Sequence, residues 1–146
     1  MQIEIKIDAN YPEPKLIILT DRMTEEISDI LNLISSKKSD VIMGFSDDLA
    51  EILSPDDIIR VYAAGGKTVA AAGGKEYVLR QRLYELETQL GGRSFVRISN
   101  SEIINLKKAR SFDLSLSGTI CVALTDGTVT YVSRRYVSKI KEVLGL

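Results

Sequence analysis

The pentapeptide Ala-Ala-Gly-Gly-Lys occurs twice, at residues 63–67 and 71–75, and this repeat constrains the fold more than any other feature of the sequence. Paired glycines accept the positive φ values of tight turns, and a period of eight residues fits the successive hairpins of a β-meander. The segments IIRVYAA, KTVAAA and KEYVL lie between and beside the glycines. They therefore predict three short antiparallel strands over residues 58–64, 67–72 and 75–79.

More strand than helix is expected after the meander. Leucines at helical spacing predict a helix over residues 80–90. Asp126-Gly127 is the strongest local hairpin signal in the chain, and it joins two alternating segments. A last helix is expected from Ser133 to Gly145. The strands predicted in this region span residues 94–99, 119–124 and 128–132.

The first part of the chain predicts a small ββαβ layer. Residues 2–8 alternate isoleucine with polar side chains, as in a half-buried strand, and residues 16–19 form a short apolar run. Thr24 is a candidate N-cap for an amphipathic helix, which two lysines close favourably at its C-terminal end. Residues 41–45 predict a third strand. We therefore expect a subdomain over residues 1–53.

Several functions are excluded by what the sequence lacks. The chain has no histidine and one cysteine, so Ser-His-Asp catalysis, His-ligated metals and an internal disulfide are excluded. No apolar run approaches the length of a transmembrane helix, and the acidic, alternating N-terminus does not match a signal peptide. We expect a cytoplasmic protein that is not an enzyme.

The net charge of −1 conceals an asymmetry along the chain. Residues 1–57 hold 5 Lys and Arg against 13 Asp and Glu, whereas residues 58–146 hold 14 against 7. A basic excess of this size indicates a module that binds a polyanion such as nucleic acid. The alternative is that both halves are solvated surfaces that attract each other.

Other candidate motifs give little support for a functional site. GGKT at residues 65–68 lacks the upstream glycine and the following helix of a phosphate-binding loop. The acidic pairs Asp47-Asp48 and Asp56-Asp57 fit caps and turns better than a metal site, and Cys121 fits a small core residue. Consecutive helices of a helix-turn-helix are not predicted either. No metal, cofactor or small-molecule substrate is expected.

The basic half carries a family resemblance. The segments FVRISNSEIINL (95–106) and LTDGTVTYVSRRYVSKIKEVL (124–144) resemble the LytTR DNA-binding domain. The upstream segment, residues 57–90, fits the same domain, with its opening strand, its meander and its "LR…L-x-E-L" helix. Three separate motifs therefore agree in order and spacing, over about 90 residues from near Ser54 to the end.

The resemblance implies an α+β, mainly β domain over residues 54–146, with stacked antiparallel sheets and short helices. Such domains insert loops into successive major grooves of double-stranded DNA, usually at repeated half-sites in bacterial promoters. In a structurally described relative three loop positions contact bases, and two of them match Asn100 and Arg135. The third has histidine in the relative and falls in the first meander loop, where this chain has Lys67.

Elementary chemistry supports these roles. Asparagine can pair with an adenine edge and arginine with guanine. The alternatives are a turn role for Asn100 and helix surface for Arg135, although cations are disfavoured at a helix N-terminus. Asn105 is expected to be a structural polar group. The candidate phosphate contacts are Arg134, Arg97, Ser101, Lys107, Lys108, Arg110 and Lys139.

Residues 1–53 are too short for a receiver domain, so the resemblance is to a free-standing regulator without phosphorylation control. We expect this region to form a homodimer, because strand edges invite pairing. Free-standing relatives are often paired with a small inhibitory membrane protein, which the resemblance adds as a candidate partner. Two alternatives stay open: an interaction module whose basic half binds an acidic partner, and a small-molecule sensor or enzyme that uses the Gly-Gly loops.

Overall fold

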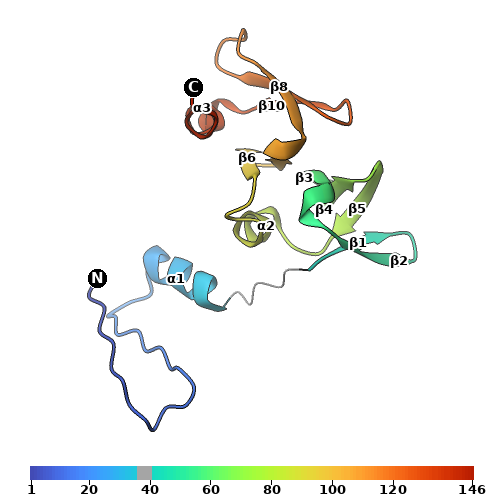
Figure 1. The fold of residues 1–146 in the computed structure, drawn as a ribbon. Coiled ribbons are helices and arrows are strands. Elements are labelled where there is room, and N and C mark those ends of the chain that lie inside the picture. Colours follow the sequence, from blue (N-terminus) through green and yellow to red (C-terminus); the bar gives the residue numbers. More distant parts are fainter. Residues whose placement is uncertain (36–40) are drawn as a thin grey trace. The chain divides into compact units, whose positions relative to one another are not determined.

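The computed structural model describes residues 1–35 and 41–146, and its contacts divide the chain after Ser35 (Figure 1). We call residues 1–35 the N-terminal unit and residues 41–146 the sheet unit. The division lies before the boundary predicted between residues 53 and 54. It does so because residues 42–53 form a strand pair that belongs to the sheet unit.

The sheet unit contains a seven-stranded antiparallel sheet with the strand order β2-β1-β5-β4-β3-β7-β6. The strands are β1 (Ile42–Ser46), β2 (Leu49–Leu53), β3 (Ile58–Ala64), β4 (Lys67–Ala72), β5 (Lys75–Leu79), β6 (Phe95–Ser99) and β7 (Glu102–Asn105). The meander β3-β4-β5 has the bounds that the repeat predicts. Gly65 and Gly66 have φ values of 57° and 76°, so this tight turn requires the conformational freedom of glycine.

A second sheet has three antiparallel strands in the order β10-β9-β8. These strands are β8 (Ala109–Asp113), β9 (Ile120–Leu124) and β10 (Val129–Val132). The helices of this unit are α2 (Leu83–Gln89) and α3 (Val137–Leu144), with short 3-10 turns η1 (Pro55–Asp57), η2 (Leu106–Lys108) and η3 (Arg134–Tyr136). The mainly β, α+β class is therefore confirmed. No helix among the described residues is long and apolar enough to cross a membrane.

Two hydrophobic cores lie on opposite faces of the large sheet. Neighbouring residues of a strand point to opposite faces, so Ile58 joins one core and Ile59 the other. The first core contains the leucines of α2, as its spacing predicts, and the second contains the three-stranded sheet and Ile140 of α3. The β3-β7-β6 part of the large sheet is thus covered from both sides, which gives the loops at the ends of these strands a rigid frame.

Asn105 is a structural polar group, as predicted. It is 1% exposed, and its amide donates a hydrogen bond to the carbonyl of Ile58 at 2.9 Å. Its Oδ1 accepts from the hydroxyl of Ser94 at 2.7 Å and from the N–H of Lys107 at 3.0 Å. These bonds fix the end of β7 to the start of β3, so every polar atom of the buried amide group is used.

The charge asymmetry of the sequence does not follow the division of the fold. Residues 41–146 hold 14 Lys and Arg against 12 Asp and Glu, a much smaller excess than the one counted from residue 58. The reason is that five acidic residues before residue 58 belong to this unit. Asp47, Asp48 and Glu51 lie on the β1–β2 hairpin, at one edge of the large sheet, and Asp56 and Asp57 lie in η1. Charge is therefore separated within the sheet unit, with acidic groups at the β2 edge.

The N-terminal unit contains one helix, α1 (Glu25–Ser35). Thr24 caps it as predicted, because its Oγ1 accepts a hydrogen bond from the N–H of Ile27 at 3.3 Å. The lysines expected at its C-terminal end, Lys37 and Lys38, lie outside the described residues. The strands predicted at residues 2–8 and 16–19 are wrong for this structure, since neither segment pairs with another described strand.

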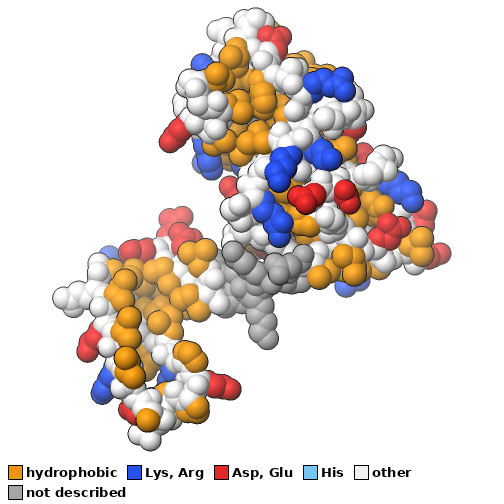
Figure 2. Space-filling model, in the orientation of Figure 1, with side chains coloured by type: hydrophobic (Ala, Val, Ile, Leu, Met, Phe, Trp, Pro, Cys, Tyr) orange, Lys and Arg blue, Asp and Glu red, His pale blue; other side chains and the backbone are white. Residues whose placement is uncertain are grey.

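Apolar side chains of the N-terminal unit gather on its surface (Figure 2). α1 and the segment before it form an apolar groove lined by Leu16, Ile18, Thr20, Met23, Ile27, Leu31 and Ile34. Residues 1–35 hold 3 Lys and Arg against 7 Asp and Glu, so this unit is also acidic. A surface of this kind is unusual for a unit that packs only against itself.

Candidate nucleic-acid interface

Three loops of the sheet unit meet at one end of the large sheet. The N–H of Ala63, just before the β3–β4 turn, donates to the carbonyl of Ser101 in the β6–β7 turn at 2.9 Å. The N–H of Ser133, just after β10, donates to the carbonyl of Ile98 in β6 at 2.8 Å. We call residues 64–67, 99–101 and 133–136 the three-loop edge. Segments far apart in sequence are therefore held side by side by main-chain hydrogen bonds.

Asn100 and Arg135, both predicted to contact bases, lie together at this edge. The hydroxyl of Tyr136 donates a hydrogen bond to Oδ1 of Asn100 at 3.2 Å. The guanidinium carbon of Arg135 lies 5.8 Å from the centroid of the Tyr136 ring, within the range of a cation–π contact. Both predicted side chains are exposed. Tyr136 thus connects an amide and a guanidinium group that come from different loops.

The guanidinium group of Arg97 is hydrogen-bonded to the backbone of the β6–β7 turn. Its Nε donates to the carbonyl of Ser99 at 2.8 Å, and its Nη2 donates to the carbonyl of Asn100 at 2.6 Å. Its Nη1 pairs with a carboxylate oxygen of Glu87 in α2 at 2.9 Å. The side chain is 14% exposed. All three guanidinium nitrogens are occupied within the chain, so Arg97 fixes the backbone that carries Asn100.

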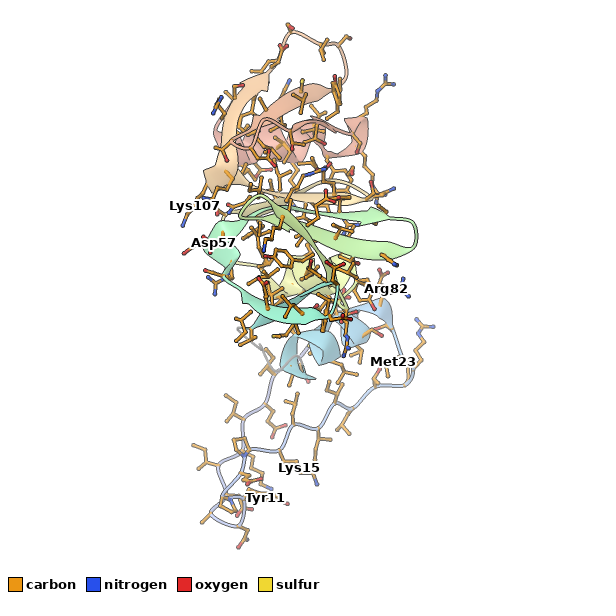
Figure 3. All side chains as sticks on the ribbon, turned by 90° about the vertical axis from the view of Figure 1, so that its right-hand side faces the viewer. Tyr11, Lys15, Met23, Asp57, Arg82 and Lys107 are labelled. Atoms are coloured by element: carbon orange, nitrogen blue, oxygen red, sulfur yellow. The ribbon has the colours of Figure 1, made fainter. Side chains whose placement is uncertain are left out.

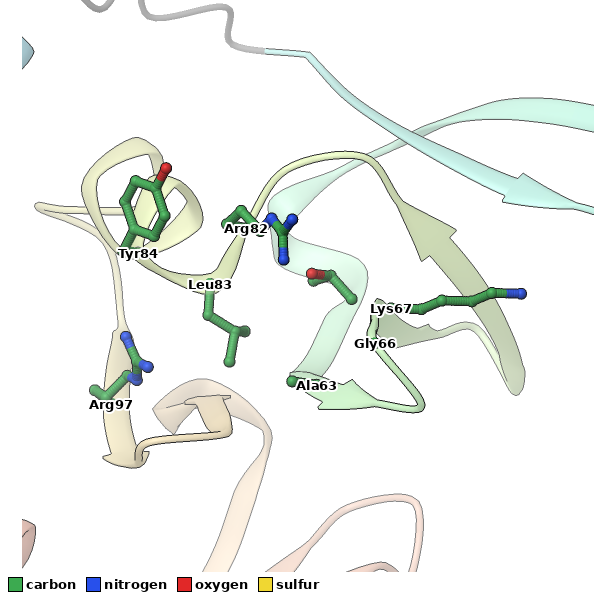
Figure 4. Close-up of a pocket in the computed structure, with 8 residues that line it drawn as sticks. Ala63, Gly66, Lys67, Arg82, Leu83, Tyr84 and Arg97 are labelled. Carbon is green, nitrogen blue, oxygen red and sulfur yellow. The ribbon is translucent and has the colours of Figure 1, made fainter.

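Lys67 begins β4 at the same edge, beside a hollow of about 560 Å³ (Figure 4). The hollow is lined by Ala63, Gly66, Lys67, Thr68, Arg82, Leu83, Tyr84 and Arg97. Lys67 extends away from Leu83 and Arg97, whereas Arg82 and Arg97 border the space between the meander and α2 (Figure 4). The hollow therefore has a basic rim that adjoins the three-loop edge.

Three further predicted contacts lie at or next to this edge. Ser101 is exposed and its N–H donates to the hydroxyl of Ser99 at 3.2 Å. The guanidinium group of Arg134 lies against Gly118, so close that a Cβ there would come within 3.2 Å of it. Lys139 is exposed in the first turn of α3, which follows η3 directly. Arg134 and Lys139 therefore add two cations at or next to the edge, and Ser101 adds a hydroxyl group.

Lys107, Lys108 and Arg110 lie elsewhere. β7 separates them from Asn100, since the β6–β7 turn precedes this strand and η2 follows it. Figure 3 shows Lys107 beside Asp57, on the side of the unit opposite to Arg82. The structure therefore brings the three predicted base contacts to one edge and leaves these three cations at the other end of β7.

A buried polar network holds the three-loop edge in shape. Glu102, 8% exposed at the start of β7, accepts a hydrogen bond from Thr130 of β10 at 2.5 Å. Its other oxygen pairs with Nη1 of Arg60 at 2.9 Å. The bond to Thr130 joins the large sheet to the small one. Because β7 begins after Ser101 and β10 ends before Ser133, this link sets the spacing of two loops.

The network continues on the outer face of the meander. The guanidinium carbon of Arg60 lies 4.1 Å from the Tyr62 ring centroid, and the Tyr62 hydroxyl donates to Glu76 at 2.7 Å. The hydrogen bond to the Glu76 carboxylate, together with partial burial, raises the pKa of Tyr62 above its ordinary value. The phenol therefore stays protonated, as a hydrogen-bond donor, to a higher pH than an ordinary tyrosine.

The sequence motifs set aside above are found in ordinary places in the structure. Among the described residues, no three Cys, Asp or Glu side chains are grouped as metal ligands. Cys121 is half-buried in β9 and, unlike its neighbours Ile120 and Val122, is not part of the second core, so the core position predicted for it is wrong. The GGKT segment lies in the β3–β4 hairpin, so it lacks the helix that a phosphate-binding loop must open. Polar and basic side chains from separate parts of the sequence come together at the three-loop edge.

Two residues of this region were not predicted from the sequence. The Tyr136 ring packs against the second core, and no local pattern predicts that its hydroxyl reaches Asn100 across 36 positions of the chain. Arg82 lies immediately before α2, where the helix dipole disfavours a cation. The same argument singles out Arg134 and Arg135, so applying it to both helices would have found Arg82.

Comparison with known proteins gives consistent results. The family model for the LytTr DNA-binding domain matches residues 50–145. Two proteins named as uncharacterized HTH-type transcriptional regulators, from Staphylococcus aureus strains NCTC 8325 and MRSA252, are each 33% identical over 147 residues, covering 100% of this chain and 99% of the relative. A solved LytTr DNA-binding domain, from a Bacillus cereus protein named as a methyl-accepting/DNA response regulator, matches with a TM-score of 0.70 at 23% identity, over 73% of this chain and 97% of that one.

Proposed function

The chain belongs to the LytTr DNA-binding domain family, as a DNA-binding regulator of transcription, and we propose that its three-loop edge reads base edges in the major groove. The relatives are named as HTH-type regulators. In the described residues, however, α2 is followed by β6, and α3 is preceded by β10 and η3. Loops, rather than a recognition helix, are the elements that present side chains to DNA.

The hydrogen bond from Tyr136 to Asn100 is the observation that carries this proposal. It places an amide and the guanidinium group of Arg135 on neighbouring loops of one frame. An asparagine amide matches the N6 and N7 edge of adenine, and an arginine fork matches O6 and N7 of guanine. Side chains held by a rigid shell can discriminate bases, because little freedom is lost when they bind.

The surrounding cations divide into two roles. Arg97 acts as a positioning residue, since its guanidinium nitrogens are bound to Ser99, Asn100 and Glu87. Phosphate contacts come from exposed cations around the edge, which supply affinity without sequence preference. These cations are Arg82, Arg134, Lys139 and Lys67. Lys67 stands where the structurally described relative reads a base with histidine, and we propose that it contacts phosphate instead of a base. Lys107, Lys108 and Arg110 serve as phosphate contacts only if the duplex extends past β7.

The proposal is tested by selection from a random duplex pool with the full-length protein at near-physiological salt. We expect a recovered motif of two half-sites, and for Arg135→Ala a loss of about 1–3 kcal/mol with relaxed preference at one base pair. Arg97→Ala should reduce preference while leaving the salt dependence of binding unchanged. Recovery of no motif, with binding lost as salt rises, would favour the interaction module instead.

We also propose that the regulator works as a homodimer and acts in the cytoplasm. Two half-sites require two reading surfaces, and the exposed apolar side chains of residues 1–35 supply a surface for association. The small inhibitory membrane protein stays a prediction, as does the absence of enzyme activity.

A further inference from the structure

Residues 3–7 form an extended segment with no partner inside its own unit. Ile3, Ile5 and Ile7 are 87%, 85% and 96% exposed. Among the described residues, no backbone hydrogen bond joins residues 2–7 to another part of the chain. Three isoleucines on one face of an extended chain, with free N–H and C=O groups on its edges, form a strand that lacks a neighbour.

The sequence of this segment is complementary to itself. In an antiparallel pair centred on Ile5, Ile3 lies opposite Ile7 of the second copy, and Glu4 lies opposite Lys6 of the second copy. Both Glu–Lys pairs then join opposite charges on one face, while six isoleucines share the other. A parallel pair in register would instead place Glu4 beside Glu4 and Lys6 beside Lys6.

We propose that residues 3–7 pair antiparallel with the same residues of a second copy, about a two-fold axis at Ile5. This inference rests on the proposed homodimer and names its contact surface. Two strands alone are marginal in water, so their apolar face needs a cover. The groove of about 370 Å³, lined by α1 and by residues of the 16–20 segment, supplies apolar surface in the same unit.

Cross-linking tests the position of the axis. In full-length Cys121→Ala protein, Ile5→Cys places two thiols directly opposite each other, so oxidation should give a disulfide-linked dimer. Ile7→Cys is the matched control, because its two thiols would lie about 14 Å apart, beyond the reach of a disulfide. Equal cross-linking of both variants, or none with Ile5→Cys, would overturn the proposal.

Charge exchange tests the register. Glu4→Lys and Lys6→Glu each replace both attractive pairs by repulsive ones, and each should raise the dimer dissociation constant about tenfold. The double variant Glu4→Lys/Lys6→Glu restores opposite charges and should recover the wild-type constant in sedimentation equilibrium. Both side chains are exposed, so the fold of the chain is not at stake. A double variant as weak as the single ones would overturn the proposed register.

Binding of a duplex with one half-site separates this inference from the proposed function. The Glu4→Lys variant should bind a duplex with one half-site as tightly as wild type. It should lose the additional affinity that wild type gains from a second half-site. If the variants stay dimeric while DNA is still bound specifically, the strand pairing is wrong and the proposed function stands. If the wild type forms the expected dimer but recovers no DNA motif, the proposed function fails alone.

Discussion

Residues 2–8 and strand β9 have a similar spacing of aliphatic residues, but the first segment is exposed and the second is buried. Both segments place a large aliphatic residue at every second position, but the residues between are polar in residues 2–8, whereas they are Cys121 and Ala123 in β9. In β9, Ile120, Val122 and Leu124 are at most 1% exposed, because the large sheet and α3 cover them. The isoleucines of residues 2–8 are almost fully exposed in the N-terminal unit.

The difference shows what an alternating pattern means. It indicates that one face of a segment must be covered, but it does not say whether the cover comes from the same chain. In the sheet unit β9 is covered from within the chain, and the three-loop edge lies exposed. In the N-terminal unit the cover proposed above is the same segment of a second copy. The sheet unit thus presents loops from a covered frame, and we propose that the N-terminal unit is covered by pairing with a second copy.

The largest expected effect contrasts the two segments directly. Ile120→Ala should destabilise the sheet unit by about 2–5 kcal/mol, because it leaves a cavity between the two sheets. Ile5→Ala should change that stability by less than about 0.5 kcal/mol, since the side chain is exposed. Urea unfolding of both variants at low protein concentration measures the difference. Equal losses would mean that residues 2–8 pack inside the monomer.

Substitutions of two asparagines distinguish a residue that stabilises the fold from a residue that contacts DNA. Asn105→Ala should cost about 1–3 kcal/mol of stability, because it leaves the Ile58 carbonyl and the Lys107 N–H without their partner. Asn100→Ala should leave the unfolding midpoint unchanged and weaken specific DNA binding. Thermal unfolding together with a duplex titration checks both. A large stability loss for Asn100→Ala would assign it to the frame.

The two copies of the repeat provide a control for charge. Lys67 and Lys75 follow the same glycine pair, but successive turns of a meander lie at opposite ends of the sheet. Lys67→Ala should weaken binding to all duplexes alike and lower the salt slope by about one. Lys75→Ala should leave the slope unchanged. Equal slopes for both variants would remove the β3–β4 turn from the interface.

The smallest effect concerns the outer face of the meander. The Glu76 carboxylate raises the pKa of Tyr62, so the stability from this hydrogen bond is fully present below the ordinary pKa of tyrosine. It is lost as pH rises through the raised value. Glu76→Gln should return the pKa of Tyr62 toward its ordinary value, measured by NMR of the tyrosine rings. An unchanged pKa would contradict the bond.

Much of the fold follows from local sequence, and the exceptions have physical causes. The glycine pairs and flanking residues place β3, β4 and β5, and leucine spacing places α2. β7 escaped prediction because all four of its residues are buried, which removes the alternation that identifies a strand. β2 escaped because most of its residues are exposed or half-exposed at the sheet edge, so its single buried residue gives no clear period.

Part of the candidate site could also be predicted, because some of its residues are indicated by local sequence. Asn100 and Arg135 stand beside strand ends and in motifs that resemble a known family, so single positions indicate them. Arg97 was predicted to contact phosphate, and the contacts that support a positioning role instead come from Ser99 and Asn100 nearby and from Glu87 in α2. The bond from Tyr136 to Asn100 depends on the docking of two sheets, which no local pattern encodes.

Turns, side-chain periods and helix caps follow from local sequence, because positive φ values, side-chain alternation and capping hydrogen bonds depend on residues a few positions apart. The tertiary structure decided which strands are neighbours: β1 beside β5, β3 beside β7, and β10 across from β7 through Thr130 and Glu102. Those neighbours gather three loops at one edge and leave Lys107 at the other end of β7. Long-range pairing depends on which faces bury the most apolar surface together, and that is a property of the whole chain.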